Sequence, residues 1–230
     1  MKLRDVGFTF GFADWAVDGD IHHQSLSHKS WSIFVYIQQR LTKAKINTDG
    51  ITGIWFAPVQ ERTLLPVVQR GSNLIVDVRI NWDHFAALET CNEVNGLFCD
   101  LYEQGLDRIE QERGLPVDFL RDTICEFRDG HYENRWTFKT KVFRAKKTKA
   151  QLDCVMNTQS FRLILIIWQH EKEVFRDVIL ETDPDPFFFY YQFKDVLLKD
   201  GVVSVQRRKP QLTDSGQDPT PLFAWELEAK

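Results

Sequence analysis

The feature that most constrains the fold of this chain is a proline-free stretch, residues 82–113, with apolar side chains at helical spacing. The side chains that recur at this spacing are Phe85, Leu88, Val94, Phe98, Leu101 and Ile109. Asn81 precedes the stretch and can accept hydrogen bonds from the first free amides of a helix. Gly114 and Pro116 follow it, and both residue types commonly end helices. We therefore expect one long helix at the centre of the structure.

Two glycines, Gly96 and Gly105, lie inside this predicted helix. Each lowers helix stability by about 1 kcal/mol relative to alanine, so we expect a bend or close helix packing there. A second, shorter helix is expected over 117–127, before the turn signal Asp129-Gly130. The buried face of the long helix is expected to include Val94, Phe98 and Leu101.

Short segments with alternating apolar residues predict strands on both sides of these helices. Before the helices, strands are expected over 51–57, 73–80 and 31–37, although the last segment also fits a helix. After them, an antiparallel meander is expected over 135–144, 151–156, 161–168, 174–181 and 202–206. The segment 161–168 is apolar on both faces, which is typical of a central strand. A helix is favoured over a strand for 187–198, because an aspartate and a proline precede it.

These elements predict an α+β fold, in which antiparallel sheets carry a long central helix and a second, shorter helix on one face. The chain has 230 residues, enough for one large domain or two small ones. No linker-like composition interrupts it, so we favour a single domain, 1–230. The alternative is a sub-boundary near residue 130.

Composition and motifs exclude several classes of protein. The net charge of −4 argues against a general nucleic-acid binder. The N-terminus does not read as a signal peptide, and the longest apolar run, 163–168, is too short to span a bilayer. Four cysteines without paired spacing predict free thiols in the cytoplasm. No phosphate loop, nucleophile elbow or metalloprotease motif occurs, so we expect no catalytic residue, cofactor or metal.

Two acidic groups are candidates for partner binding. Acids on the C-terminal half of the long helix sit unfavourably with its dipole, and a basic partner would explain them. Two further acids precede a run of five aromatic residues, not all of which can point the same way on a helix or strand. An acidic rim beside exposed aromatic side chains is typical of protein-binding surfaces. The candidate residues are Asp183, Asp185, Phe187, Tyr190, Glu103 and Asp107.

Two other segments carry alternative functions. Cations without acids between 135 and 149 predict a nucleic-acid-binding strand, whose candidates are Arg135, Lys139, Lys141 and Arg144. Alternation places the first three of them on one strand face. The segment 14–28 is expected to be a polar loop whose carboxylates and imidazoles could hold a metal for an enzyme: Asp14, Asp18, Asp20, His22, His23 and His28.

Taken together, the sequence favours a cytoplasmic, non-catalytic module that binds another protein, with nucleic acid and membrane as disfavoured partners. Immunity proteins of bacterial toxin systems share this physical profile: they are acidic, mix α and β, and lack active-site motifs. The narrower hypothesis is therefore a toxin-neutralising protein whose partner is a toxin domain.

Overall fold

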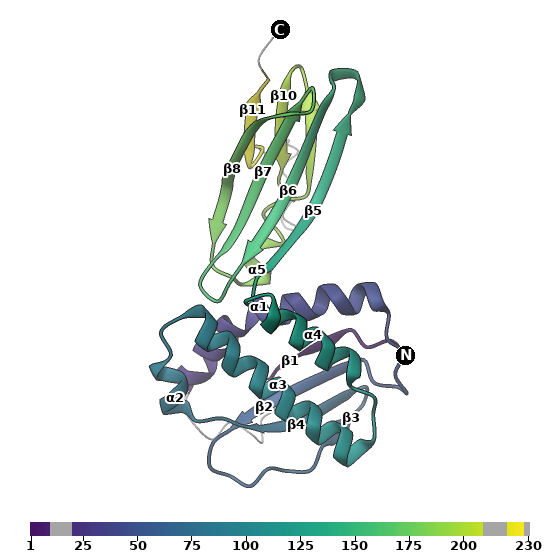
Figure 1. The fold of residues 1–230 in the computed structure, drawn as a ribbon, viewed down its shortest axis with the longest axis vertical. Coiled ribbons are helices and arrows are strands. Elements are labelled where there is room, and N and C mark those ends of the chain that lie inside the picture. The colour runs from purple at the N-terminus through teal and green to yellow at the C-terminus, as the bar shows by residue number, and fades with distance from the viewer. Residues whose placement is uncertain (10–19, 209–219, 228–230) are drawn as a thin grey trace. The chain divides into compact units, whose positions relative to one another are not determined.

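The computed structural model describes residues 1–9, 20–208 and 220–227, with the backbone alone for 20–24. Its internal contacts group into two compact units, Met1–Asn134 and Arg135–Lys230 (Figure 1). We call them the N-terminal and the C-terminal unit. Both helices and antiparallel sheets are present, which confirms the α+β class. Whether the chain behaves as a single domain stays a prediction.

The N-terminal unit contains a four-stranded sheet in the order β1-β2-β4-β3. Its strands are β1 (Asp5–Phe8), β2 (Gly53–Val59), β3 (Val68–Arg70) and β4 (Asn73–Arg79). The predicted strands 51–57 and 73–80 correspond to β2 and β4. β1, β2 and β4 run parallel, whereas only β3 is antiparallel. The local pattern did not indicate this direction, because strand direction depends on how the connecting segments return the chain.

The first connecting segment is a helix, α1 (Asp20–Ala44), so the predicted strand 31–37 is wrong. Leu26, Ile33, Ile37 and Leu41 are all buried and recur at helical spacing. The alternating apolar residues that suggested a strand overlap with this helical stripe. The stripe continues beyond 37, and that continuation distinguishes a helix from a short strand.

The predicted long helix is divided into α2 (Trp82–Ala87) and α3 (Cys91–Arg113). Asn81 caps α2 as expected, but Thr90 opens a second helix. The Thr90 hydroxyl accepts a hydrogen bond from the Glu93 amide at 3.2 Å, and the Glu93 carboxylate accepts one from the Thr90 amide at 2.9 Å. This reciprocal capping satisfies amides that a continuous helix would bond internally. The buried positions are confirmed for Val94, Phe98 and Leu101.

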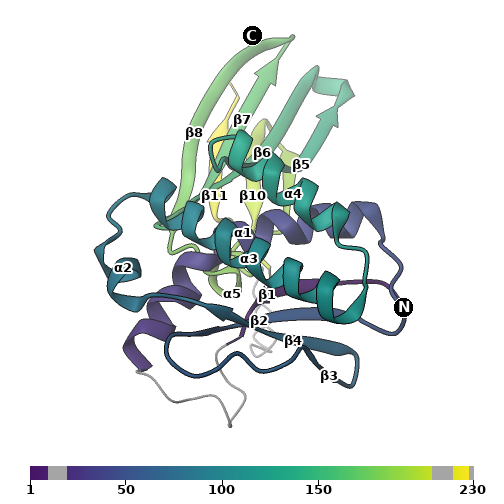
Figure 2. The ribbon, with the colours of Figure 1, turned by 60° about the horizontal axis from the view of Figure 1, so that its bottom comes forward.

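The helices enclose the core of the N-terminal unit. α3 lies against β4, and α4 (Asp118–Asp129) contacts both α3 and α1. Figure 2 shows α3 and α4 on one side of the sheet. A Cβ at Gly105 would overlap the Phe56 ring and lie 3.2 Å from Val78 Cγ1. The close packing expected at this glycine is therefore confirmed.

The C-terminal unit is built from two antiparallel sheets. One has the order β5-β6-β7-β8 and the other β11-β10-β9. The strands are β5 (Asn134–Phe143), β6 (Thr148–Met156), β7 (Phe161–Gln169), β8 (Lys172–Thr182), β9 (Asp195–Lys199), β10 (Val202–Gln206) and β11 (Phe223–Glu226). The sheets face each other, since Phe175 of β8 contacts Phe223 and Trp225 of β11. β7 pairs with β6 and β8, which confirms the central strand.

The predicted helix 187–198 is wrong except at its start. Asp185 caps α5 (Pro186–Phe189), and Pro186 occupies its first turn as expected. The helix then stops, because the following chain joins the second sheet as β9. Phe193 and Val196 are buried there. Pairing and burial in the sheet therefore override the local helical signal.

Candidate functional site

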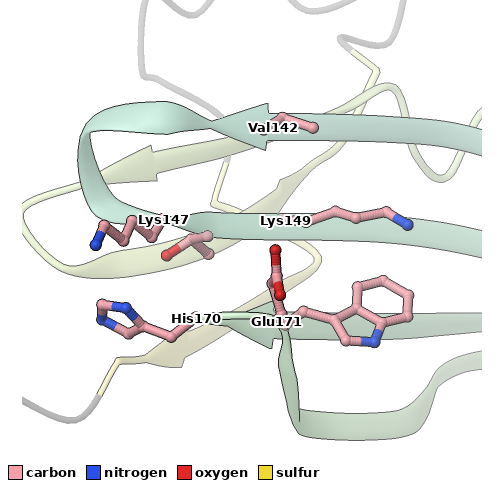
Figure 3. Close-up of a pocket in the computed structure, with 7 residues that line it drawn as sticks. Val142, Lys147, Lys149, His170 and Glu171 are labelled. Atoms are coloured by element: carbon pink, nitrogen blue, oxygen red, sulfur yellow. The ribbon is translucent and has the colours of Figure 1, made fainter.

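The open end of the first sheet carries a groove between two hairpin turns. We call it the tip groove; it has a volume of about 670 Å³ and is lined by Val142, Lys147, Thr148, Lys149, Trp168, His170 and Glu171. The β5–β6 turn includes a short 3₁₀ helix, η1 (Arg144–Lys146), and the β7–β8 turn supplies the last two lining residues. The His170 amide donates to the Lys147 carbonyl at 2.9 Å, which ties the two turns together (Figure 3).

Two of the lining side chains, a lysine and a tryptophan, contact each other in this groove. The Lys149 ammonium lies 4.3 Å from the centre of the Trp168 ring, a cation–π distance. Val142 is 63% exposed beside them. Figure 3 shows the Glu171 carboxylate directed toward the strand that carries Lys149. The groove therefore combines apolar surface with ammonium groups.

The turns around the groove are rich in cations. Arg144, Lys146, Lys147 and Lys172 are exposed. Within the described residues, the structure gives none of the four an ion-pair partner. Arg144 is one of the predicted nucleic-acid contacts, but the tip groove also depends on Trp168, His170 and Glu171, from the next hairpin. Only strand register brings the two hairpins together.

The expected basic strand face does not exist as one stripe. Lys141 Nζ lies 2.7 Å from Asp195 Oδ2, and Lys139 Nζ lies 3.8 Å from Asp195 Oδ1. Arg135 instead approaches Asp153 at 3.5 Å, beside Thr137, which donates to the same carboxylate at 2.8 Å. The prediction that Arg135, Lys139 and Lys141 share a face is therefore wrong, since Asp195 belongs to β9 of the facing sheet.

Pairing with the two lysines changes the pKa of the Asp195 carboxylate. Partial burial raises its pKa, but hydrogen bonds from Lys141 and the Val196 amide, with both lysine charges, outweigh burial and lower the pKa overall. Asp195 is therefore ionised at neutral pH. It pairs with two of the cations from which the nucleic-acid alternative was built and cancels one of their two charges.

The aromatic segment 186–191 separates into buried and exposed side chains. Phe189 is fully buried and stacks on Phe161, with ring centres 3.8 Å apart. Phe187, Phe188 and Tyr191 are 69%, 57% and 60% exposed. Three exposed aromatic side chains on one short segment form a distinct surface, which we call the aromatic surface.

The other candidates near this segment have different environments. Asp183 is exposed, and no described residue pairs with it. Asp185 is half-buried and accepts a hydrogen bond from the Phe187 amide at 2.8 Å. Tyr190 is half-buried against Phe189, and burial raises the pKa of its hydroxyl. Asp185 therefore caps the start of α5, whereas Asp183 is exposed and could contact a partner.

The acids of α3 are paired within their own unit. Glu103 lies 3.1 Å from Arg128, and Asp107 lies 2.6 Å from Arg121. Both arginines belong to α4, which packs beside α3. Helix packing thus explains Glu103 and Asp107 at the unfavourable end of the helix dipole, without a partner.

The segment 14–28 is only partly described. Asp14 and Asp18 lie outside the described residues, whereas Asp20, His22, His23 and His28 belong to α1. The expectation of a loop is therefore wrong from residue 20 onward. In the part of the chain with described side chains, no three histidine, cysteine or acidic side chains gather as metal ligands would.

Two of the four cysteines are poor nucleophiles in this fold. Burial raises the pKa of the Cys99 thiol to about 12 and also raises that of Cys154. Both thiols stay protonated at neutral pH, and the thiolate is the reactive form. Cys91 and Cys125 are likewise unpaired, with Cys125 exposed.

No protein-family model, curated protein or solved structure matches this chain. Among the described helices, none combines the length and the apolar character needed to cross a membrane.

Proposed function

We propose that this chain is a non-catalytic protein-binding module that docks its partner through the aromatic surface. The observation that carries the proposal is the exposure of Phe187, Phe188 and Tyr191 by more than half on one short segment. Large aromatic side chains contribute most of the energy at protein interfaces, because they bury much area with few rotatable bonds.

The aromatic surface is presented on a fixed backbone. Phe189 anchors the segment in the core by stacking on Phe161, and Asp185 caps the helix that carries Phe187 and Phe188. A preorganised surface binds with a smaller entropic cost than a flexible loop. Asp183 adds a negative charge beside the rings, so the partner fits best if it offers apolar pockets with a basic rim.

Two further features belong to this proposal. The four unpaired thiols suit a reducing compartment, and we place the protein in the cytoplasm. The narrower hypothesis is that the partner is a toxin domain that the module neutralises. It adds one requirement, namely that binding abolishes the activity of the partner.

The test is co-purification from the native host, followed by a titration of the identified partner against variants. We expect the double variant Phe188→Ala with Tyr191→Ala to weaken binding at least about a hundredfold. Asp183→Lys should slow association, and this effect should shrink as salt is raised. Leu197→Ala, at a side chain 44% exposed on β9, is the matched control and should bind normally.

Equal affinity of the wild-type protein and the aromatic double variant would refute the docking surface. A partner that binds through the aromatic surface but keeps its activity in the complex would refute the toxin-neutralising hypothesis alone.

A further inference from the structure

We propose that the tip groove is a second binding site, which takes an acidic protein segment with an apolar side chain among its carboxylates. Five cations surround the groove or line it: Arg144, Lys146, Lys147, Lys149 and Lys172. On a chain of net charge −4, this concentration of positive charge is a local exception. It complements an acidic ligand and would steer its approach.

The lining of the groove specifies more than charge. Val142 is 63% exposed, and Trp168 is half-buried, so a ligand side chain can gain apolar contact between them. The Lys149 ammonium lies over the Trp168 ring, and its N–H donors that do not point at the ring can bind a carboxylate. An extended peptide with alternating acidic and apolar residues matches this arrangement.

Backbone strain at the groove points to a role for its side chains. Seven described residues other than glycine have positive φ, and three of them line the groove: Lys147, His170 and Glu171 at φ 46°, 50° and 66°. Glycine adopts such angles without steric cost, whereas other residues lose about 1 kcal/mol. Side chains at positions where glycine would cost less are consistent with binding.

A peptide fits this groove better than a nucleic-acid strand. A phosphate backbone needs a continuous basic track, but on the strand that leads away from the groove Lys139 and Lys141 already share Asp195, which cancels one of their two charges. The Glu171 carboxylate stands within the groove and would repel regularly spaced phosphates. Carboxylates of a peptide are spaced by the choice of residues and can avoid it.

The tip groove is separate from the aromatic surface. β8 begins directly after Glu171 and ends shortly before Asp183, and its 11 residues extend about 35 Å (Figure 1). The two surfaces therefore lie at opposite ends of the same unit. Loss of one leaves the other intact, and the two proposals fail independently.

The experiment selects ligands for the full chain from a phage-displayed library of random peptides. We expect enrichment of sequences rich in Asp and Glu with Leu, Phe or Trp among them. Fluorescence anisotropy with a labelled selected peptide should show weaker binding as NaCl is raised. The Phe188→Ala, Tyr191→Ala variant should bind this peptide as the wild-type protein does.

A pair of matched variants separates binding from stability. Lys147→Gly relieves the left-handed backbone and removes one charge, so it should raise the dissociation constant at least about threefold without lowering the melting temperature. Lys45→Gly makes the same change at φ 54° on an exposed residue outside the groove, and peptide affinity should not change.

Selection of sequences without acidic enrichment would overturn the proposal. Equal effects of Lys147→Gly and Lys45→Gly on peptide affinity would also overturn it. Tighter binding of a short single-stranded RNA than of the selected peptide, lost in Lys147→Gly, would assign the groove to nucleic acid instead.

Discussion

Gly105 is the residue on which the contact between α3 and the sheet depends most directly. Alanine favours a helix over glycine by about 1 kcal/mol, but its Cβ would overlap the Phe56 ring. Overpacking of this kind costs about 1–3 kcal/mol. We expect Gly105→Ala to lower the free energy of unfolding by up to about 2 kcal/mol, measured by urea denaturation.

Gly96 provides the control on the same helix. A Cβ there would approach only the Tyr132 hydroxyl, at 3.3 Å, which is the far end of a side chain that can move. Gly96→Ala should therefore raise the free energy of unfolding by about 0.5–1 kcal/mol. If both substitutions raised the free energy of unfolding, helix propensity rather than packing would dominate at Gly105.

At the scale of elements, the start of α3 depends on the reciprocal cap between Thr90 and Glu93. Hydrogen bonds from the Thr90 amide and hydroxyl, with one from the Glu89 amide, lower the pKa of Glu93. A carboxyl whose pKa is lower in the folded state stabilises that state above its unfolded pKa. This stabilisation is lost as the pH falls through the folded pKa.

We therefore expect Thr90→Ala to reduce stability by about 1 kcal/mol at neutral pH. Glu93→Gln should also lower the melting temperature at pH 7, and its difference from the wild-type protein should shrink as the pH is lowered below the ordinary range of glutamate. Thermal melts of both variants from neutral to acidic pH provide the measurement. If the difference in melting temperature between Glu93→Gln and the wild-type protein grew on acidification, the role of Glu93 in the cap would be contradicted.

At the scale of the whole molecule, the two units have separate cores. The buried cluster of the N-terminal unit runs from Leu3 to Phe127, and Tyr132 packs against it. Asn134 closes the unit, since its side-chain amide donates to the Ser32 carbonyl at 2.7 Å in a buried hydrogen bond. We expect a core of this size to fold independently.

A fragment of residues 1–134 should therefore unfold cooperatively by circular dichroism. The fragment 1–130 is the matched comparison, because it lacks Tyr132 and Asn134. It should melt at least about 3 °C lower, since the Ser32 carbonyl loses its buried partner. If the longer fragment shows no cooperative transition, the chain folds only as one domain.

Part of the fold was predictable because some signals are local. The buried positions Val94, Phe98 and Leu101 and the central strand β7 follow from apolar periodicity, which reflects burial directly. The start of α5 follows from the aspartate cap and Pro186. The run of aromatic residues also required that some be buried and others exposed, and Phe189 and Phe188 are examples of each.

The tertiary structure alone decided the rest, because each remaining feature depends on a distant partner. The predicted strand 31–37 is a helix, because a longer apolar stripe is buried. The segment 195–199, predicted as helix up to 198, is a strand, because it pairs with β10. The charges show the same dependence: Asp195 lies far along the chain from Lys139 and Lys141, yet it pairs with both of them. The tip groove forms where two hairpins meet in register, so its composition cannot be read from either hairpin alone.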